Sequence, residues 1–127
     1  MQTHKDLILW QKSVDFVVEV YKLTNSFPKE EIYGLTSQIR RSAVSISSNI
    51  AEGYGRHSDK ELVRFLFISL GSASEIETQL LISQRLNFLD NESFEKLNRD
   101  ILEIIRMLSA LIKSKNQGGL IHPDNFE

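Results

Sequence analysis

The chain has 127 residues, the size of one ordinary domain, and 41% of them are hydrophobic and 25% charged, a balance typical of folded soluble proteins. Because 15 Lys and Arg stand against 17 Asp and Glu, the formal net charge is -2, and bulk charge does not indicate a strongly basic nucleic-acid-binding protein. The lack of cysteine excludes disulfides, thiolate zinc sites and cysteine nucleophiles, and it agrees with the cytoplasmic location that we expect.

The first predicted helix runs from about Leu7 to Ser26. The residues before it are polar, and no run of about 18 apolar residues occurs, so we expect neither a signal peptide nor a membrane span. Phe27-Pro28 ends this helix because the residue before a proline disfavours helical backbone. The second helix begins between Lys29 and Leu35 and ends near Gly53-Tyr54-Gly55, where we expect a glycine in the left-handed cap conformation.

The third predicted helix opens with a capping box from Ser58 to Glu61, in which each side chain accepts a hydrogen bond from the other residue's backbone N–H. It continues to about Asn87. The fourth helix starts after Asp90 or Asn91, either a good N-cap residue, and ends before Gly118-Gly119. We therefore expect a helical bundle over residues 1–117 and a flexible tail over residues 118–127.

Short connections between these helices predict antiparallel neighbours, and so an all-α, antiparallel up-down four-helix bundle. A βαβ layout is excluded because no window between the helices alternates with period two.

The apolar patterns of the four helices differ. The fourth helix has a single apolar stripe, and its other side faces solvent. The stripe consists of Phe94, Leu97, Ile101, Ile104, Ile105, Leu108, Leu111 and Ile112. The first has two nearly opposite stripes, one containing Trp10, Val17, Val18 and Tyr21 and the other Leu9, Phe16, Val20 and Phe27. The second has a small or apolar back, and the third is uncharged from Phe65 to Ser74.

One chain of this size cannot bury three such helices completely, so we expect a homo-oligomer that uses the first three helices. The alternative is a monomer with some exposed apolar residues, which is common. Within the third helix, the small residues from Gly71 to Ser74 predict close packing against the second helix; a ligand slot there is the alternative.

No metal, cofactor or catalytic site is expected. A di-iron bundle needs Glu-x-x-His on two helices, and none of His4, His57 and His122 has a glutamate three residues earlier. Met107 is better explained as packing than as a haem ligand. A catalytic carboxylate at Glu52 or Glu75 stays as an alternative, although neither has a visible second catalytic group.

Two groups of polar residues are candidate sites. A structural polar network between the second and third helices is expected from Asn49, Glu52, Ser72 and Glu75. A nucleic-acid-binding surface around or near the turn between these helices is expected from Arg40, Arg41, Arg56, Lys60 and Arg64. The default alternative is a solvated face with scattered charges, but a ring of copies would multiply a weak basic patch.

The segment Gln38 to Gly53, QIRRSAVSISSNIAEG, is specific, as is the segment Phe65 to Glu75. With the opening from Leu7 to Lys12 and the segment Tyr21 to Pro28, it resembles the bacterial four-helix-bundle family encoded in intervening sequences of 23S ribosomal RNA genes, the S23 ribosomal protein family, over roughly residues 6–115.

The resemblance implies an up-down bundle that assembles as a homopentamer, in a family whose molecular function is mostly unassigned. The family is similar to accessory variability proteins of diversity-generating retroelements, which are basic pentamers that bind a reverse transcriptase and nucleic acid. This implies that Arg40, Arg41 and Arg56 are the basic positions to test. We therefore expect a non-enzymatic oligomeric adaptor for RNA, DNA or a reverse-transcriptase-like protein; the alternative is a structural or protein-partner scaffold with no nucleic-acid role.

Overall fold

The computed structural model describes residues 3–116, and these residues confirm the all-α fold predicted from the sequence. Four long helices follow one another: α1 (Ile8–Thr24), α2 (Leu35–Tyr54), α3 (Asp59–Arg85) and α4 (Asn91–Lys115). Two single turns of 3-10 helix, η1 (His4–Asp6) and η2 (Lys29–Glu31), precede α1 and α2. The tail predicted over residues 118–127 lies outside the described residues.

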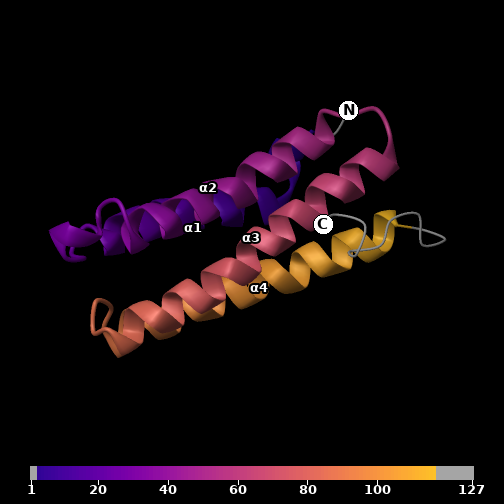
Figure 1. The fold of residues 1–127 in the computed structure, drawn as a ribbon. Helices are drawn as coiled ribbons and strands as arrows, with labels where there is room; N and C mark the ends of the chain where they lie inside the picture. The colour runs from indigo at the N-terminus through magenta and orange to yellow at the C-terminus, as the bar shows by residue number, and fades with distance from the viewer. Residues whose placement is uncertain (1–2, 117–127) are drawn as a thin grey trace.

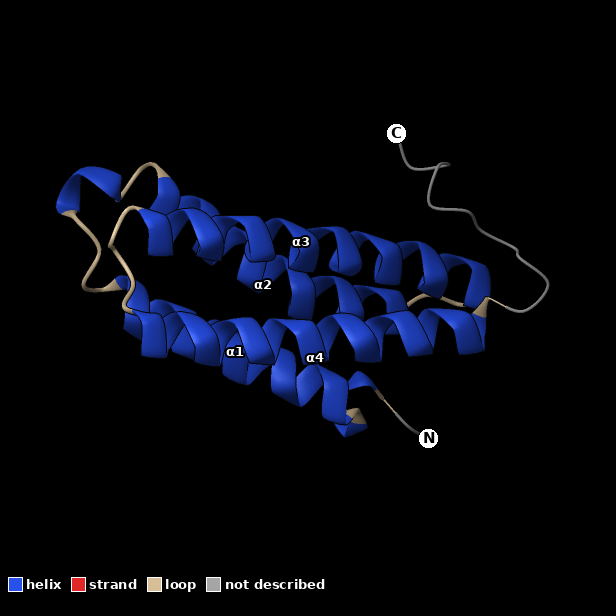
Figure 2. Ribbon diagram, turned by 90° about the horizontal axis from the view of Figure 1, so that it is seen from below, coloured by secondary structure: helices blue, strands red, loops and turns tan. Residues whose placement is uncertain are grey.

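The four helices run up and down as an elongated bundle (Figure 1). Each helix packs against two others: α2 contacts α1 and α3, and α4 contacts α3 and α1, with the most extensive contact between α2 and α3. The α1–α2 and α3–α4 connections lie at one end of the bundle and the α2–α3 turn lies at the other (Figure 2). At the first end, the rings of Phe27 and Phe88 meet with their centroids 5.7 Å apart, which joins the two connections.

The helix starts follow the predicted caps, with one difference. Asp90 caps α4 by accepting a hydrogen bond from the Ser93 N–H at 2.7 Å, and Ser58 Oγ caps α3 by accepting from the Glu61 N–H at 3.2 Å. The Glu61 carboxylate, however, pairs with Arg64 Nε at 3.4 Å and does not close the second half of the capping box. The Glu61 carboxylate therefore pairs with Arg64 on the same helix face, whereas the capping box predicts a hydrogen bond from the Ser58 backbone N–H.

The predicted left-handed glycine at the end of α2 is wrong. Gly53 lies inside the helix, and Gly55 has a φ of −83°, in the right-handed region. Gly53 is needed for another reason: a Cβ there would lie 3.0 Å from Leu62 Cδ1 and 3.0 Å from Phe65 Cβ, so its lack of a side chain lets α2 and α3 approach closely. The left-handed residue is Asn87, with a φ of 62°, which follows the C-cap residue Leu86 of α3.

One face of each helix fills the core. The stripe predicted for α4 is confirmed, with Leu97, Ile101, Ile104, Leu108 and Ile112 buried. Of the two stripes on α1, the one that contains Leu9, Phe16 and Val20 is buried, whereas Val18 and Tyr21 of the other stripe are exposed. The bundle therefore uses one apolar stripe of α1 and leaves much of the second at the surface.

α3 is the longest helix of the bundle, with 27 residues, and its middle is apolar. Within the part of the chain that the structure describes, it is the one helix long and apolar enough, by composition, to cross a membrane, and 44% of its most apolar 18-residue window is buried in the bundle. Such a window is also typical of the core helix of a folded domain. Its exposed residues nevertheless include Ile68, Leu81 and Ile82, so its apolar side chains point both into the core and out of it.

Candidate binding surfaces

The five basic residues singled out in the sequence do not form one cluster. Arg40 and Arg41 lie in the first half of α2, whereas Arg56, Lys60 and Arg64 surround the α2–α3 turn. At a rise of about 1.5 Å per residue, α2 separates the two groups by roughly 20 Å. They are therefore two surfaces, and each has different neighbours.

Arg40 is held against the end of α1. Its Nε donates to Thr24 Oγ1 at 2.9 Å and its terminal nitrogen donates to Asn25 Oδ1 at 3.1 Å, while the guanidinium stacks over the Tyr21 ring at 4.5 Å from the centroid. A cation at the C-terminal end of a helix also interacts favourably with the carbonyl groups there. Arg40 therefore fastens α2 to α1, and its donors are largely occupied.

Arg41, one residue later, is exposed and lines an open groove between α1 and α2 with a volume of about 560 Å³. Tyr21, Ile32 and Val44 supply the apolar part of this groove. The buried hydroxyl of Thr36 also lines it and has no hydrogen-bond partner among the described residues. No ion pair or hydrogen bond within residues 3–116 occupies the Arg41 side chain, so its charge is available to a partner.

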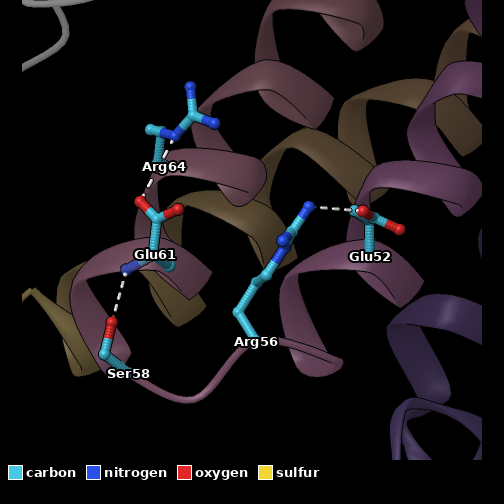
Figure 3. Close-up of polar contacts among 5 residues, drawn as sticks. All are labelled: Glu52, Arg56, Ser58, Glu61 and Arg64. Atoms are coloured by element: carbon cyan, nitrogen blue, oxygen red, sulfur yellow. Dashed lines mark hydrogen bonds and ion pairs between the residues drawn. The ribbon is translucent and has the colours of Figure 1, made fainter.

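The basic residues at the α2–α3 turn are partly neutralised. Arg56 pairs with Glu52 at 2.6 Å and Arg64 pairs with Glu61 at 3.4 Å (Figure 3). Both guanidinium groups also lie over the ring of Phe65, at 5.0 and 5.1 Å from its centroid. These contacts hold the two arginines in defined positions at the surface.

Lys60, on the first turn of α3, is exposed. Next to it, a hollow of about 200 Å³ is lined by Arg56, His57 and Lys115, so α4 adds a cation to this end of the bundle. The same hollow contains Asp59, which lowers the local positive charge. The turn is therefore a weakly basic surface, and a single copy offers few free cations.

The predicted polar network exists in part and is built around serines. Asn49 Nδ2 donates to the Ser45 carbonyl oxygen at 2.8 Å and to Ser45 Oγ at 2.9 Å, and Ser72 Oγ donates to Ser45 Oγ at 2.8 Å. One turn away, the Ser42 hydroxyl donates to Glu75 Oε2 at 3.4 Å. Glu52 lies outside this network because it pairs with Arg56.

Sequence reasoning missed Ser42 and Ser45, the two residues at the centre of these contacts. Their signal is their spacing of three residues on α2, which places them on one face of that helix opposite Ser72 and Glu75 of α3. The small residues of α3 pack only partly as predicted: Ser72 and Ala73 are buried, but Gly71 and Ser74 are exposed. The Gly71 position therefore points away from α2.

The α1–α4 side of the bundle is held by charged residues. Lys12 Nζ pairs with Glu103 Oε1 at 2.7 Å, and Lys96 Nζ lies 3.7 Å from Glu19 Oε1. The hydrogen bond between Lys12 and Glu103 raises the pKa of Lys12 above 10.5 and lowers the pKa of Glu103 below 4.5. A hollow of about 240 Å³ lies between these ion pairs, and Asp15 and Asp100 line it too.

Neither candidate carboxylate has the surroundings of an acid or base catalyst. Glu52 is exposed and paired with Arg56, and Glu75 is exposed and accepts from Ser42. Neither lines the hollows described above. Across residues 3–116, no three His, Cys, Asp or Glu side chains are grouped so that they could hold a metal ion. The surfaces that remain offer shape and charge to a binding partner.

Comparison with known proteins identifies the family. A family model described as 23S rRNA-intervening sequence protein matches residues 5–110. The chain belongs to this family. A solved structure from Bacteroides thetaiotaomicron, described as a protein with unknown function from the S23 ribosomal protein family, is 30% identical and superposes with a TM-score of 0.78, covering 84% of this chain and 99% of its own. The comparison with curated proteins found no match.

Membership of the 23S rRNA-intervening sequence family confirms the resemblance read from the segments 38–53 and 65–75. The solved member is described as a protein of unknown function, so the likeness supports the fold and leaves the activity open. The likeness to accessory variability proteins, and the pentamer and nucleic-acid partner that it implies, stay predictions for this family member.

Proposed function

We propose that this protein is a non-enzymatic, homo-oligomeric binding module. The proposal rests on where its exposed apolar side chains lie. Among residues 3–116, eleven large hydrophobic residues are exposed, and all but one of them lie on or beside α1, α2 and α3: Ile8, Val18, Tyr21, Ile32, Tyr33, Val44, Ile68, Leu81, Ile82 and Leu86. The exception is Leu102 on α4.

α4 differs from the other three helices in the side chains that it exposes. The outward face of α4 carries exposed charges such as Lys96, Arg99 and Arg106, as expected of a helix that faces water. The outward faces of α1, α2 and α3 also carry exposed charges, such as Lys12 and Arg41, but they hold most of the exposed large apolar side chains as well. Covering these side chains gains about 25 cal/mol per Å² of apolar surface buried. Most soluble oligomers are built from identical copies, and the family resemblance suggests five of them.

Light scattering coupled to size-exclusion chromatography tests the assembly. We expect a mass several times that of the 14.6 kDa chain at micromolar concentration. The variant Ile82→Glu places a charge on the outward face of α3 and should shift the protein towards monomers. Leu102→Glu is the matched control, because Leu102 is 40% exposed and Ile82 is 43% exposed, yet Leu102 lies on α4. A monomeric wild-type protein would contradict the proposal.

Lack of a catalytic arrangement around Glu52 and Glu75 supports a binding role over an enzymatic one. For the partner, we propose RNA or DNA at the α2–α3 turn. Support comes from the free cation of Lys60 and from Arg56 and Arg64, which Phe65 holds at the surface. An assembly would repeat this weakly basic surface once per copy, and repeated weak contacts add to avidity.

Fluorescence anisotropy with a structured RNA tests the nucleic-acid partner. We expect binding that weakens steeply between about 50 mM and about 200 mM salt, because phosphate contacts release counterions. The double variant Lys60→Ala/Arg64→Ala should weaken binding. Lys22→Ala/Lys29→Ala removes the same charge from the opposite end of the bundle and should not.

Binding without salt dependence, or no binding at low salt, would favour the alternative of a protein-partner scaffold. The occupation of Arg40 by α1 and the ion pairs of Arg56 and Arg64 are the observations that support this alternative. A pull-down that recovers a reverse-transcriptase-like protein would identify the protein that such a scaffold binds.

A further inference from the structure

Gly71 is a glycine that the folded chain does not need. It lies in the middle of α3, with helical residues for more than three turns on either side. A Cβ atom built at this position would meet no atom of the chain within 4 Å. A Cβ at Gly53, in contrast, would lie 3.0 Å from Leu62 Cδ1 and from Phe65 Cβ, so crowding within the chain explains one helical glycine and not the other.

A glycine in a helix interior is among the least favourable residues for helix formation, because it loses the most backbone freedom on folding. Gly71 also adopts ordinary helical backbone, so no left-handed conformation requires it. What a glycine supplies at an exposed helical position is close approach: another backbone can come nearer to the helix there than any side chain would allow. The requirement for Gly71 therefore lies outside the single chain.

The surroundings of Gly71 have the pattern of a helix–helix contact. Ile68, Gly71, Glu75, Thr78 and Ile82 are all exposed and follow one another at spacings of three and four residues. This spacing keeps side chains on one face of a helix and is the spacing by which helices pack side by side. The exposed apolar side chains of Ile68 and Ile82 lie on either side of Gly71 along the helix. A second helix that approaches closely at Gly71 would therefore bury apolar surface on both sides of it.

The charges beside this face match a second copy of the same chain. Glu75 lies on the α3 face, and Arg41 is exposed on the neighbouring helix α2, one residue from the Ser42 that contacts Glu75. Despite this proximity, the two side chains form no ion pair with each other, and Arg41 forms none within residues 3–116. Each copy thus presents an unpaired anion and an unpaired cation next to the same apolar face, which makes the face complementary to itself in charge.

We propose that Gly71 is the point of closest approach between the outward face of α3 and a helix of a second copy, with Glu75 of one copy paired to Arg41 of the other. The inference rests on the proposed homo-oligomer and specifies which face makes it. A methyl group or larger side chain at residue 71 keeps the copies apart, although it fits the isolated chain.

Sedimentation velocity on the full chain tests the glycine. We expect Gly71→Leu to weaken self-association at least about tenfold while its helical circular dichroism stays that of the wild type, because position 71 is exposed and a Cβ there meets no atom of the chain within 4 Å. Ala110→Leu introduces the same leucine side chain on the exposed face of α4 and should leave the assembly unchanged. If wild type and Gly71→Leu assemble equally, the inference fails and the proposed oligomer stands; if wild type is monomeric, the proposed oligomer itself fails.

A charge exchange tests whether the occupant is a second copy. Arg41→Glu alone and Glu75→Arg alone each place like charges opposite each other and should weaken self-association. The chain that carries both substitutions restores opposite charges between copies and should recover assembly. A double variant as weakly associated as the single variants would overturn the pairing of Arg41 with Glu75 between copies.

Discussion

The α2–α3 seam and the α1–α4 seam join helices of the same bundle by different means. Between α2 and α3 the contact is close, with Gly53 at the crossing and the buried Ser69 hydroxyl donating to the Ile46 carbonyl oxygen at 2.9 Å. Between α1 and α4, ion pairs between Lys12 and Glu103 and between Lys96 and Glu19 bridge an open hollow. The stability of the α2–α3 contact should therefore depend on side-chain volume, and the stability of the α1–α4 contact should depend on pH and salt.

The largest effect is expected from cavities made on the two sides of the core. Ile46→Ala removes a side chain with no exposure beside the close seam and should lower the free energy of unfolding by about 4 kcal/mol. Ile104→Ala makes the same change at a residue that lines the α1–α4 hollow, where water and side chains can fill the space, and should cost about 2 kcal/mol. Chemical denaturation measures both. Equal losses would show that the seams do not differ in packing.

An intermediate effect is expected from Gly53→Ala. Alanine favours helix, but its methyl group would lie 3.0 Å from Leu62 Cδ1 and from Phe65 Cβ, so these neighbours must shift by a few tenths of an ångström. Such overpacking should lower the free energy of unfolding by about 2 kcal/mol. The control is Gly71→Ala, measured at a concentration that keeps the chain monomeric, where the same change meets no atom and should raise stability. A more stable Gly53→Ala would remove the argument for a close crossing.

The smallest effect is expected from Glu103→Gln at the α1–α4 seam, and it depends on pH. Because Lys12 lowers the pKa of Glu103 below its ordinary 4.5, the pair stabilises the fold above pH 4.5 and loses this contribution as the pH falls through the lowered pKa. At the alkaline side, Lys12 contributes below pH 10.5 and loses its contribution as the pH rises through its raised pKa.

Urea denaturation of wild type and Glu103→Gln across acid pH checks this expectation. The difference in unfolding free energy should shrink in acid and also in high salt, since both side chains are exposed. Glu95→Gln is the control, because Glu95 is exposed on the same helix and takes part in no ion pair of residues 3–116. A difference that persists in acid would show that Glu103 acts by packing and not by charge.

The helices were predictable from the sequence because their signals are local. The stripe on α4, the proline after Phe27 and the capping residues Ser58 and Asp90 each act over one or two turns. The end of α2 was mispredicted because Gly53 allows α3 to pack closely and does not end α2. A contact with another helix cannot be recognised from the residues next to Gly53 in the sequence. The left-handed residue fell to Asn87, the residue type that tolerates this conformation best after glycine.

The candidate sites were less predictable because their contacts join distant parts of the chain. Arg40 was predicted to be a free cation, yet Thr24 and Asn25 at the end of another helix accept hydrogen bonds from it. Glu52 is the local exception, because its partner Arg56 lies only four residues further along the chain. Which of the two stripes of α1 turns inward also depends on the whole bundle. Sequence patterns therefore identified the residue types at these surfaces and missed their partners.

The ring contact between Phe27 and Phe88 should make local unfolding harder at one end of the bundle than at the other. It ties together the two connections at one end, where Phe27 itself is buried, so separating α1 and α2 from α3 and α4 there requires an aromatic pair to part. At the opposite end, the α2–α3 turn is the one connection between the four helices of residues 3–116, and η1 contacts α1 and α2 there. Local unfolding should begin at that turn, and amide hydrogens near residues 53–62 should exchange with solvent sooner than those near residues 80–97.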